Sequence, residues 1–118
     1  MKRWMLVAGL VLLWTLGATF TLGADLSMKD YDRLMNDASF RSYMNGVGTG
    51  FQYANALLMI RNQQRLFCTS DNVALKEDDY LDILARKIKE LKTKKPRADL
   101  RLPTVLLMGL QEAFPCDK

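Results

Sequence analysis

The chain has 118 residues, with 17 basic and 13 acidic side chains, two cysteines and no histidine. This length allows one small domain with a limited core. The net charge is +4, and it falls to +2 without Lys2 and Arg3 of the predicted signal peptide described below, which is too balanced to indicate a nucleic-acid-binding protein. Without histidine the chain lacks the commonest acid–base catalyst, and two cysteines alone cannot complete a zinc site. We therefore expect no metal and no cofactor.

The first 24 residues have the layout of a secretory signal peptide. Lys2 and Arg3 precede an apolar run from Met5 to Gly23, which ends in small residues before the first acid, Asp25. We expect cleavage after Ala24, or one residue earlier. The run is also close to the roughly 20 residues that a membrane-spanning helix needs, so an uncleaved anchor is the alternative.

Cleavage leaves a single domain, residues 25–118, in the periplasm, with no membrane insertion after the signal is removed. Subtracting Lys2 and Arg3 from the charged residues leaves 15 basic against 13 acidic, a net charge of +2. The domain keeps Cys68 and Cys116, and an even count in an exported chain indicates a disulfide. A bridge across this separation contributes about 4 kcal/mol by chain entropy. Two free thiols are the alternative if the chain is not exported.

Four segments show the helical pattern, and none shows a convincing strand pattern. Ser27, with Asp30 three residues later, can cap the first helix, and Ser39 can cap the second. Pro103 is a favoured first-turn residue for the fourth. We predict an all-α fold, a small four- to five-helix bundle tied by one disulfide. The predicted helices are Met28–Asp37, Phe40–Asn62, Lys76–Lys92 and Pro103–Phe114.

The third and fourth predicted helices differ in character. The third has an apolar stripe that includes Tyr80, Leu84 and Ile88, with acids at its start and lysines at its end, as the helix dipole favours. We interpret its charges as a solvated face. The fourth is apolar on most sides, which predicts a central place in the bundle or burial in an oligomer.

The stretch NGVGTGF, residues 45–51, places three glycines at alternate positions. A dinucleotide fingerprint needs G-x-G-x-x-G between a strand and a helix, and here the third position is Phe51 in a helical segment. Gly46, Gly50 and Ala54 are instead four residues apart on one helical face. We predict that this face packs closely against the fourth helix, with Gly109 as the matching recess.

The same helix has a second stripe, polar but uncharged, at Asn45, Thr49, Gln52 and Asn55. It is either ordinary surface that is solvated or hydrogen-bonded to a loop, or part of a partner interface. Glu112 is an acid in an apolar setting, which predicts a polar edge or a basic partner. Because the chain has no histidine, its cysteines are expected to be paired, and its other acids cluster on a helix that we expect to be exposed, we infer that the chain is not an enzyme.

Four segments, YMNGVGTGF, RLFC, DDYLDILARKIKEL and LMGLQEAFPC, occur in an order that resembles the Rap/Tai family of immunity proteins. The resemblance covers roughly residues 40–116. It implies an all-α fold, a disulfide between the FC and PC cysteines, and frequent homodimers. It also implies a periplasmic protein that neutralises a peptidoglycan amidase delivered by type VI secretion. The FCTS loop lacks the proline that commonly follows this cysteine in the family, and KKPRADLR is more basic than the usual linker.

The resemblance implies that the chain binds the amidase effector and occludes its active-site cleft. A structural or assembly subunit of an envelope complex and an acid-stress chaperone are the alternative functions. Candidate contacts with a partner are the loop after Cys68, the acidic start of the third helix and the basic segment that follows it. These comprise Thr69, Ser70, Asp71, Asn72, Asp78, Asp79, Lys94, Lys95 and Arg97.

Overall fold

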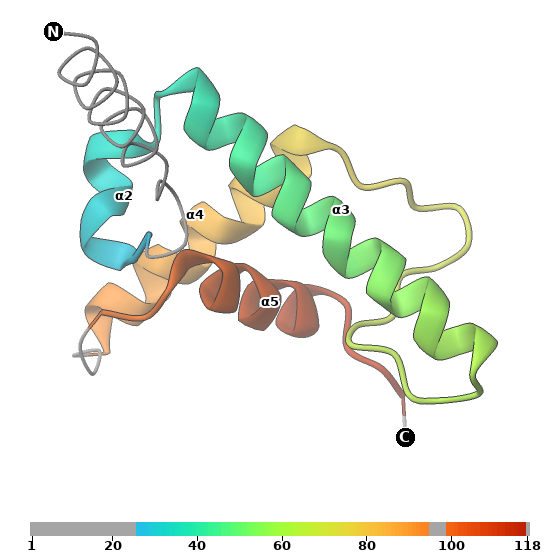
Figure 1. Ribbon diagram of the computed structural model, residues 1–118. Helices are drawn as coiled ribbons and strands as arrows, with labels where there is room; N and C mark the ends of the chain where they lie inside the picture. The colour runs from blue at the N-terminus through green and yellow to red at the C-terminus, as the bar shows by residue number, and fades with distance from the viewer. Residues whose placement is uncertain (1–25, 95–98, 118) are drawn as a thin grey trace, which may run out of the picture.

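The computed structural model describes residues 26–94 and 99–117, and these ranges contain four helices and no strand (Figure 1). The cysteines form one disulfide, Cys68–Cys116. The prediction of a small all-α bundle tied by one disulfide is confirmed. The predicted signal peptide lies outside the described residues. Within them, no helix combines the length and apolarity needed to cross a membrane. The helices are α2 (Met28–Leu34), α3 (Ala38–Ile60), α4 (Glu77–Thr93) and α5 (Leu102–Ala113).

The start of α2 is joined to the start of α5. Asp30 accepts a hydrogen bond from the Ser27 backbone N–H at 3.1 Å, as the predicted capping pattern requires. Ser27 and Arg101 form an isolated antiparallel bridge, in which the Met28 N–H donates to the Leu100 carbonyl at 2.9 Å. These bonds fix the short α2 helix, which is too short to be stable alone.

The ends of α3 differ from the prediction. Asp37, rather than Ser39, caps the helix, because its carboxylate accepts from the backbone N–H groups of Ser39 and Phe40. The other end closes in a left-handed turn, where Asn62 has φ 54° and the Gln63 N–H donates to the Leu58 carbonyl at 2.8 Å. Asparagine tolerates this conformation better than most residues, so the helix stops at Ile60.

The core is formed by α3, α4 and α5 together with Phe67 from the α3–α4 connection. Helix α5 buries its inward face fully, and only a few of its side chains are exposed. On α4 the buried positions recur at helical spacing, and the charged residues lie on the other side. The fully buried side chains are Met44, Phe67, Tyr80, Leu84, Ile88, Leu102, Val105, Leu106 and Leu110.

Two glycines allow α4 to approach both of its neighbours. A Cβ at Gly48 of α3 would lie 2.5 Å from the Tyr80 ring, and a Cβ at Gly109 of α5 would lie 2.7 Å from Ile83 Cγ2. No side chain fits at such distances, so each glycine forms a recess that an α4 side chain fills. Gly109 is therefore a recess as predicted, but its neighbour is α4 and not α3.

The predicted packing at Gly46 and Gly50 is wrong. A Cβ at either position would have nothing within 4 Å in the described part of the chain, and both glycines are exposed, while Ala54 is half-buried. A spacing of four identifies a shared face without showing which way that face points. The buried direction of α3 is set by Phe40, Met44 and Gly48.

Matched alanine substitutions separate the two kinds of glycine. We expect Gly48→Ala to destabilise the protein by about 1–3 kcal/mol, because the new methyl group meets the Tyr80 ring. We expect Gly50→Ala to stabilise it by up to about 1 kcal/mol, through helix propensity alone. Urea unfolding of both variants measures the difference. A loss of stability at Gly50 equal to that at Gly48 would contradict this assignment.

Candidate functional site

The α3–α4 loop (residues 61–76) is the longest irregular segment within the described residues. Because α3 ends at Ile60 and α4 begins at Glu77, 16 residues lie between the helices. In Figure 1 this loop turns at the end of α3 and runs back alongside it. Loops of this length without secondary structure are uncommon in compact domains and are often functional. The loop contains the predicted contacts Thr69, Ser70, Asp71 and Asn72.

Both halves of the α3–α4 loop are anchored to the core. Phe67 is fully buried, and Leu66 and Leu75 pack against the core as half-buried residues. Cys68 is bonded to Cys116 with Cα atoms 4.9 Å apart, and its backbone N–H donates to the Phe114 carbonyl at 2.8 Å. The segment after α3 is therefore fixed covalently to the end of α5.

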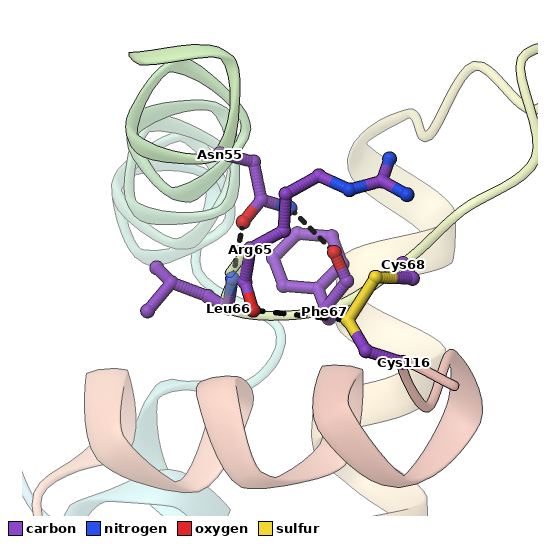
Figure 2. Close-up of a disulfide and its surroundings, with 6 residues drawn as sticks. All are labelled: Asn55, Arg65, Leu66, Phe67, Cys68 and Cys116. Carbon is purple, nitrogen blue, oxygen red and sulfur yellow. Dashed lines mark hydrogen bonds between the residues drawn. A yellow bond between two sulfur atoms is a disulfide. The ribbon is translucent and has the colours of Figure 1, made fainter. Parts of the chain in front are cut away.

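Asn55 is the polar part of this anchor (Figure 2). Its side chain is buried in α3, donates from Nδ2 to the Phe67 carbonyl at 2.9 Å, and accepts at Oδ1 from the Leu66 N–H at 2.7 Å. One amide side chain thus pairs the donor and the acceptor of two successive loop residues. The sequence left open whether the polar stripe of α3 is surface, is hydrogen-bonded to a loop or belongs to a partner interface. Asn55 is hydrogen-bonded to a loop.

Between the anchors the loop presents an exposed turn. The Val73 N–H donates to the Ser70 carbonyl at 3.0 Å, which closes a four-residue β-turn. Asp71 and Asn72 occupy its central positions, and these residue types favour turns. All four residues are exposed. We call Ser70–Val73 the exposed turn.

The acidic start of α4 is partly occupied by contacts within the chain. Arg41 of α3 binds Glu77 at 3.1 Å and Asp78 at 2.9 Å. Asp79 accepts from the Lys76 backbone N–H at 2.8 Å, which caps the helix. Asp78 still has 85% of its side-chain area exposed, so it remains accessible, whereas Asp79 has a local structural role.

The basic residues predicted as partner contacts are not found beside the exposed turn or the start of α4. Lys94 lies at the opposite end of α4 from Asp78, roughly 24 Å away for 16 residues of helix, and it binds Glu90 at 2.7 Å. Lys95 and Arg97 lie outside the described residues. The exposed turn precedes the start of α4 by a few residues of chain, whereas Lys94 lies at the opposite end of that helix.

A second candidate region is an open pocket of about 200 Å³ between α4 and α5. Lys87 crosses its edge with only 11% of its side chain exposed, and binds Glu112 at 2.5 Å and Glu90 at 3.1 Å. Glu112 was predicted to mark a polar edge or to accept a basic partner, and Lys87 is such a partner within the chain. The Lys87 ammonium is therefore paired with two carboxylates of the pocket lining. Its lining is Ile83, Arg86, Lys87, Glu90, Gly109, Glu112 and Ala113.

These ion pairs shift the pKa values of their members. The hydrogen bond to Glu112 raises the pKa of Lys87, and the bonds from Lys94 and Lys87 lower the pKa of Glu90. Near α2, the Ser27 backbone N–H lowers the pKa of Asp30, and Lys29 lowers that of Asp99. All of these groups are paired in a way that favours their charged forms.

Two residues that shape the candidate surface, the buried Asn55 and the exposed Val73, were not singled out as such from the sequence. Asn55 was predicted only as one member of a polar stripe. Its position in a largely apolar helix could have indicated a structural role, because a buried amide must find hydrogen-bond partners. Val73 carries no sequence signal beyond its position after the turn, and it is 40% exposed. The described residues contain no group of three side chains placed to hold a metal ion.

Comparison of the chain with protein-family models, curated proteins and solved structures finds no match. The candidate surface therefore rests on its own geometry.

Removal of the Asn55 amide should loosen the α3–α4 loop. Asn55→Ala leaves the Leu66 N–H and the Phe67 carbonyl without their partner, which we expect to cost about 2–4 kcal/mol. Asn45→Ala is the matched control, since Asn45 is half-buried on the same helix. Hydrogen exchange should show faster exchange at Leu66 in the first variant alone. Equal exchange in both variants would refute the anchoring role.

The stability of the fold should depend on pH at both extremes. Asp30, Glu90 and Asp99 have lowered pKa values, so their contribution is present above the ordinary carboxyl pKa and lost as pH falls through the folded values. Lys29 and Lys87 have raised pKa values, so theirs is lost only as pH rises through them. We expect a plateau between about pH 5 and pH 10. Urea unfolding across this range tests it, and Asp99→Asn should reduce the acid-side slope.

Proposed function

We propose that this protein is a periplasmic immunity protein that binds a peptidoglycan amidase effector of type VI secretion and occludes its substrate cleft. The observation that supports this most is the exposed turn on its anchored base. The resemblance of the chain to the Rap/Tai family points to the same function. The disulfide fits an oxidising compartment such as the periplasm.

Occlusion of a cleft requires shape and rigidity rather than catalysis. The exposed turn projects between anchors at Cys68 on one side and Leu75 on the other. Because these anchors already order the loop, little further entropy is lost when it binds. A turn is also narrow enough to enter a groove that accepts peptide substrates. The fold thus supplies a preformed insert.

The chemistry of the exposed turn suits the cleft of a Cys–His amidase. Ser70, Asp71 and Asn72 provide a hydroxyl, a carboxylate and an amide, all exposed. A carboxylate can pair with a protonated histidine or with a cation at the cleft rim. Asp78 extends this acidic character onto the start of α4. Val73 adds an apolar contact beside the turn.

The test is capture of the partner, followed by inhibition. Oxidised protein is used as bait against secreted and periplasmic fractions of the organism that encodes it. We expect a small Cys–His amidase whose hydrolysis of peptidoglycan stops when the bait is added. Asp71→Lys should weaken inhibition by about tenfold or more, because it reverses a charge at the centre of the interface.

Asp32→Lys is the matched control. Asp32 is exposed and lies on α2 next to Lys92, in the last turn of α4, far from the exposed turn. This variant should inhibit as well as the unmodified protein. Capture of a stable envelope complex without a hydrolase would replace the proposal with an assembly role. Capture of many unfolded proteins, and only in acid, would replace it with a chaperone role.

A further inference from the structure

The pocket between α4 and α5 is small and has a partly apolar lining. We call it the α4–α5 pocket, and its volume is about 200 Å³. Its apolar lining consists of Ile83 and Gly109, which are buried, and Ala113, which is exposed. Sites for drug-sized ligands commonly measure about 300–1,000 Å³. The α4–α5 pocket can therefore enclose the end of a ligand and not a whole cofactor.

Most of the charges around the α4–α5 pocket neutralise one another. Lys87 binds Glu112 at 2.5 Å and Glu90 at 3.1 Å, and Lys94 also binds Glu90 at 2.7 Å. Each carboxylate of the lining therefore has a cation within the chain. Arg86 adds a third cation to this group, so three positive charges stand against two negative charges. The pocket has one positive charge in excess, which favours an anionic ligand.

Arg86 is the source of this excess charge. It is joined by no ion pair to a carboxylate in the part of the chain that the structure describes. Its Nε donates only to the Asp82 backbone carbonyl, at 3.4 Å, which is longer than the usual N–H···O distance of about 2.7–3.2 Å. The two terminal nitrogens of the guanidinium therefore remain for a ligand. A planar guanidinium binds a carboxylate through two parallel hydrogen bonds, so a carboxylate is the anion that Arg86 fits best.

Glu112 supplies a hydrogen-bond acceptor from the other helix of the pocket. Its Oε2 accepts from Lys87, and 60% of its side chain is exposed. A carboxylate has about four acceptor positions, so Glu112 can also accept from an N–H of a ligand. In the last residue of a peptide, one amide N–H and the terminal carboxylate are attached to the same Cα. A chain end therefore carries the donor, the anion and a side chain that the pocket can receive together.

We propose that the α4–α5 pocket binds the C-terminal residue of a peptide that ends in a small apolar side chain. The terminal carboxylate pairs with Arg86, the last amide N–H donates to Glu112, and the side chain contacts Ile83 and Ala113. Because Arg86 is exposed, water screens the ion pair, and binding is in the millimolar range for a short peptide. No residue of the exposed turn lines this pocket, so the inference does not depend on the proposed function.

The test is an NMR titration of the oxidised, nitrogen-15-labelled protein with three short peptides. Acetyl-Ala-Ala-Ala with a free carboxylate should shift the backbone amides of Lys87 and Gly109 and saturate in the millimolar range. The same peptide with a C-terminal amide should bind about tenfold more weakly, because it cannot form the ion pair. Acetyl-glutamate amide, which carries its carboxylate on a side chain, should also bind about tenfold more weakly. This third peptide distinguishes a chain end from an acidic side chain.

Two matched variants locate the site. Arg86→Gln should weaken binding of the free-carboxylate peptide about tenfold and leave binding of the amidated peptide unchanged, because only the first uses the guanidinium. Lys89→Gln is the control, since Lys89 is an exposed cation of the same helix that does not line the pocket, and it should bind as the unmodified protein does. Both substitutions replace exposed residues by a good helix former, so folding should be retained, and the unshifted signals of the core check it.

Four results would each overturn the proposal. These are the absence of shifts at the pocket, equal binding of the free and amidated peptides, equal binding of acetyl-glutamate amide, and an equal loss of binding in the Arg86 and Lys89 variants.

Discussion

The bond between Cys68 and Cys116 is the constraint around which the α3–α4 loop and the end of α5 are arranged. It joins the loop after α3 to the segment after α5, and it lies beside Phe67, the only fully buried side chain that the loop contributes. Asn55 completes the junction by pairing the loop backbone to α3. Helix α3, the loop that follows it and the segment after α5 therefore meet at one point, which fixes this part of the irregular loop to two helices.

The other half of the architecture depends on α4, which packs against both long neighbours through glycine recesses. Tyr80 fills the space beside Gly48, and Ile83 fills that beside Gly109. Burial raises the pKa of Tyr80, as expected for a phenol enclosed by the core. Helix α4 is thus packed on two sides, and Arg41 ties its first turn to α3.

The sequence was sufficient for the fold class, the four helices and the disulfide, because these depend on periodicity, caps and cysteine count. It was insufficient for the glycines, since Gly46, Gly48 and Gly50 differ only in which side of α3 they face, and tertiary packing decides that. The sequence was also insufficient to show which of the candidate partner contacts lie close together in the fold. The residues after Cys68 form one turn, whereas Lys94 lies at the far end of a helix whose length separates it from Asp78.

The position of the exposed turn inside the disulfide-closed part of the chain has a consequence for resistance to proteolysis. Exposed loop tips are the preferred sites of protease cleavage, and Ser70–Val73 is such a tip. A cut there falls between Cys68 and Cys116, so the two fragments remain covalently joined. The anchors at Phe67 and Leu75 lie on either side of the cut and keep their places in the core. A protease can therefore cut the exposed turn without separating the two fragments of the domain.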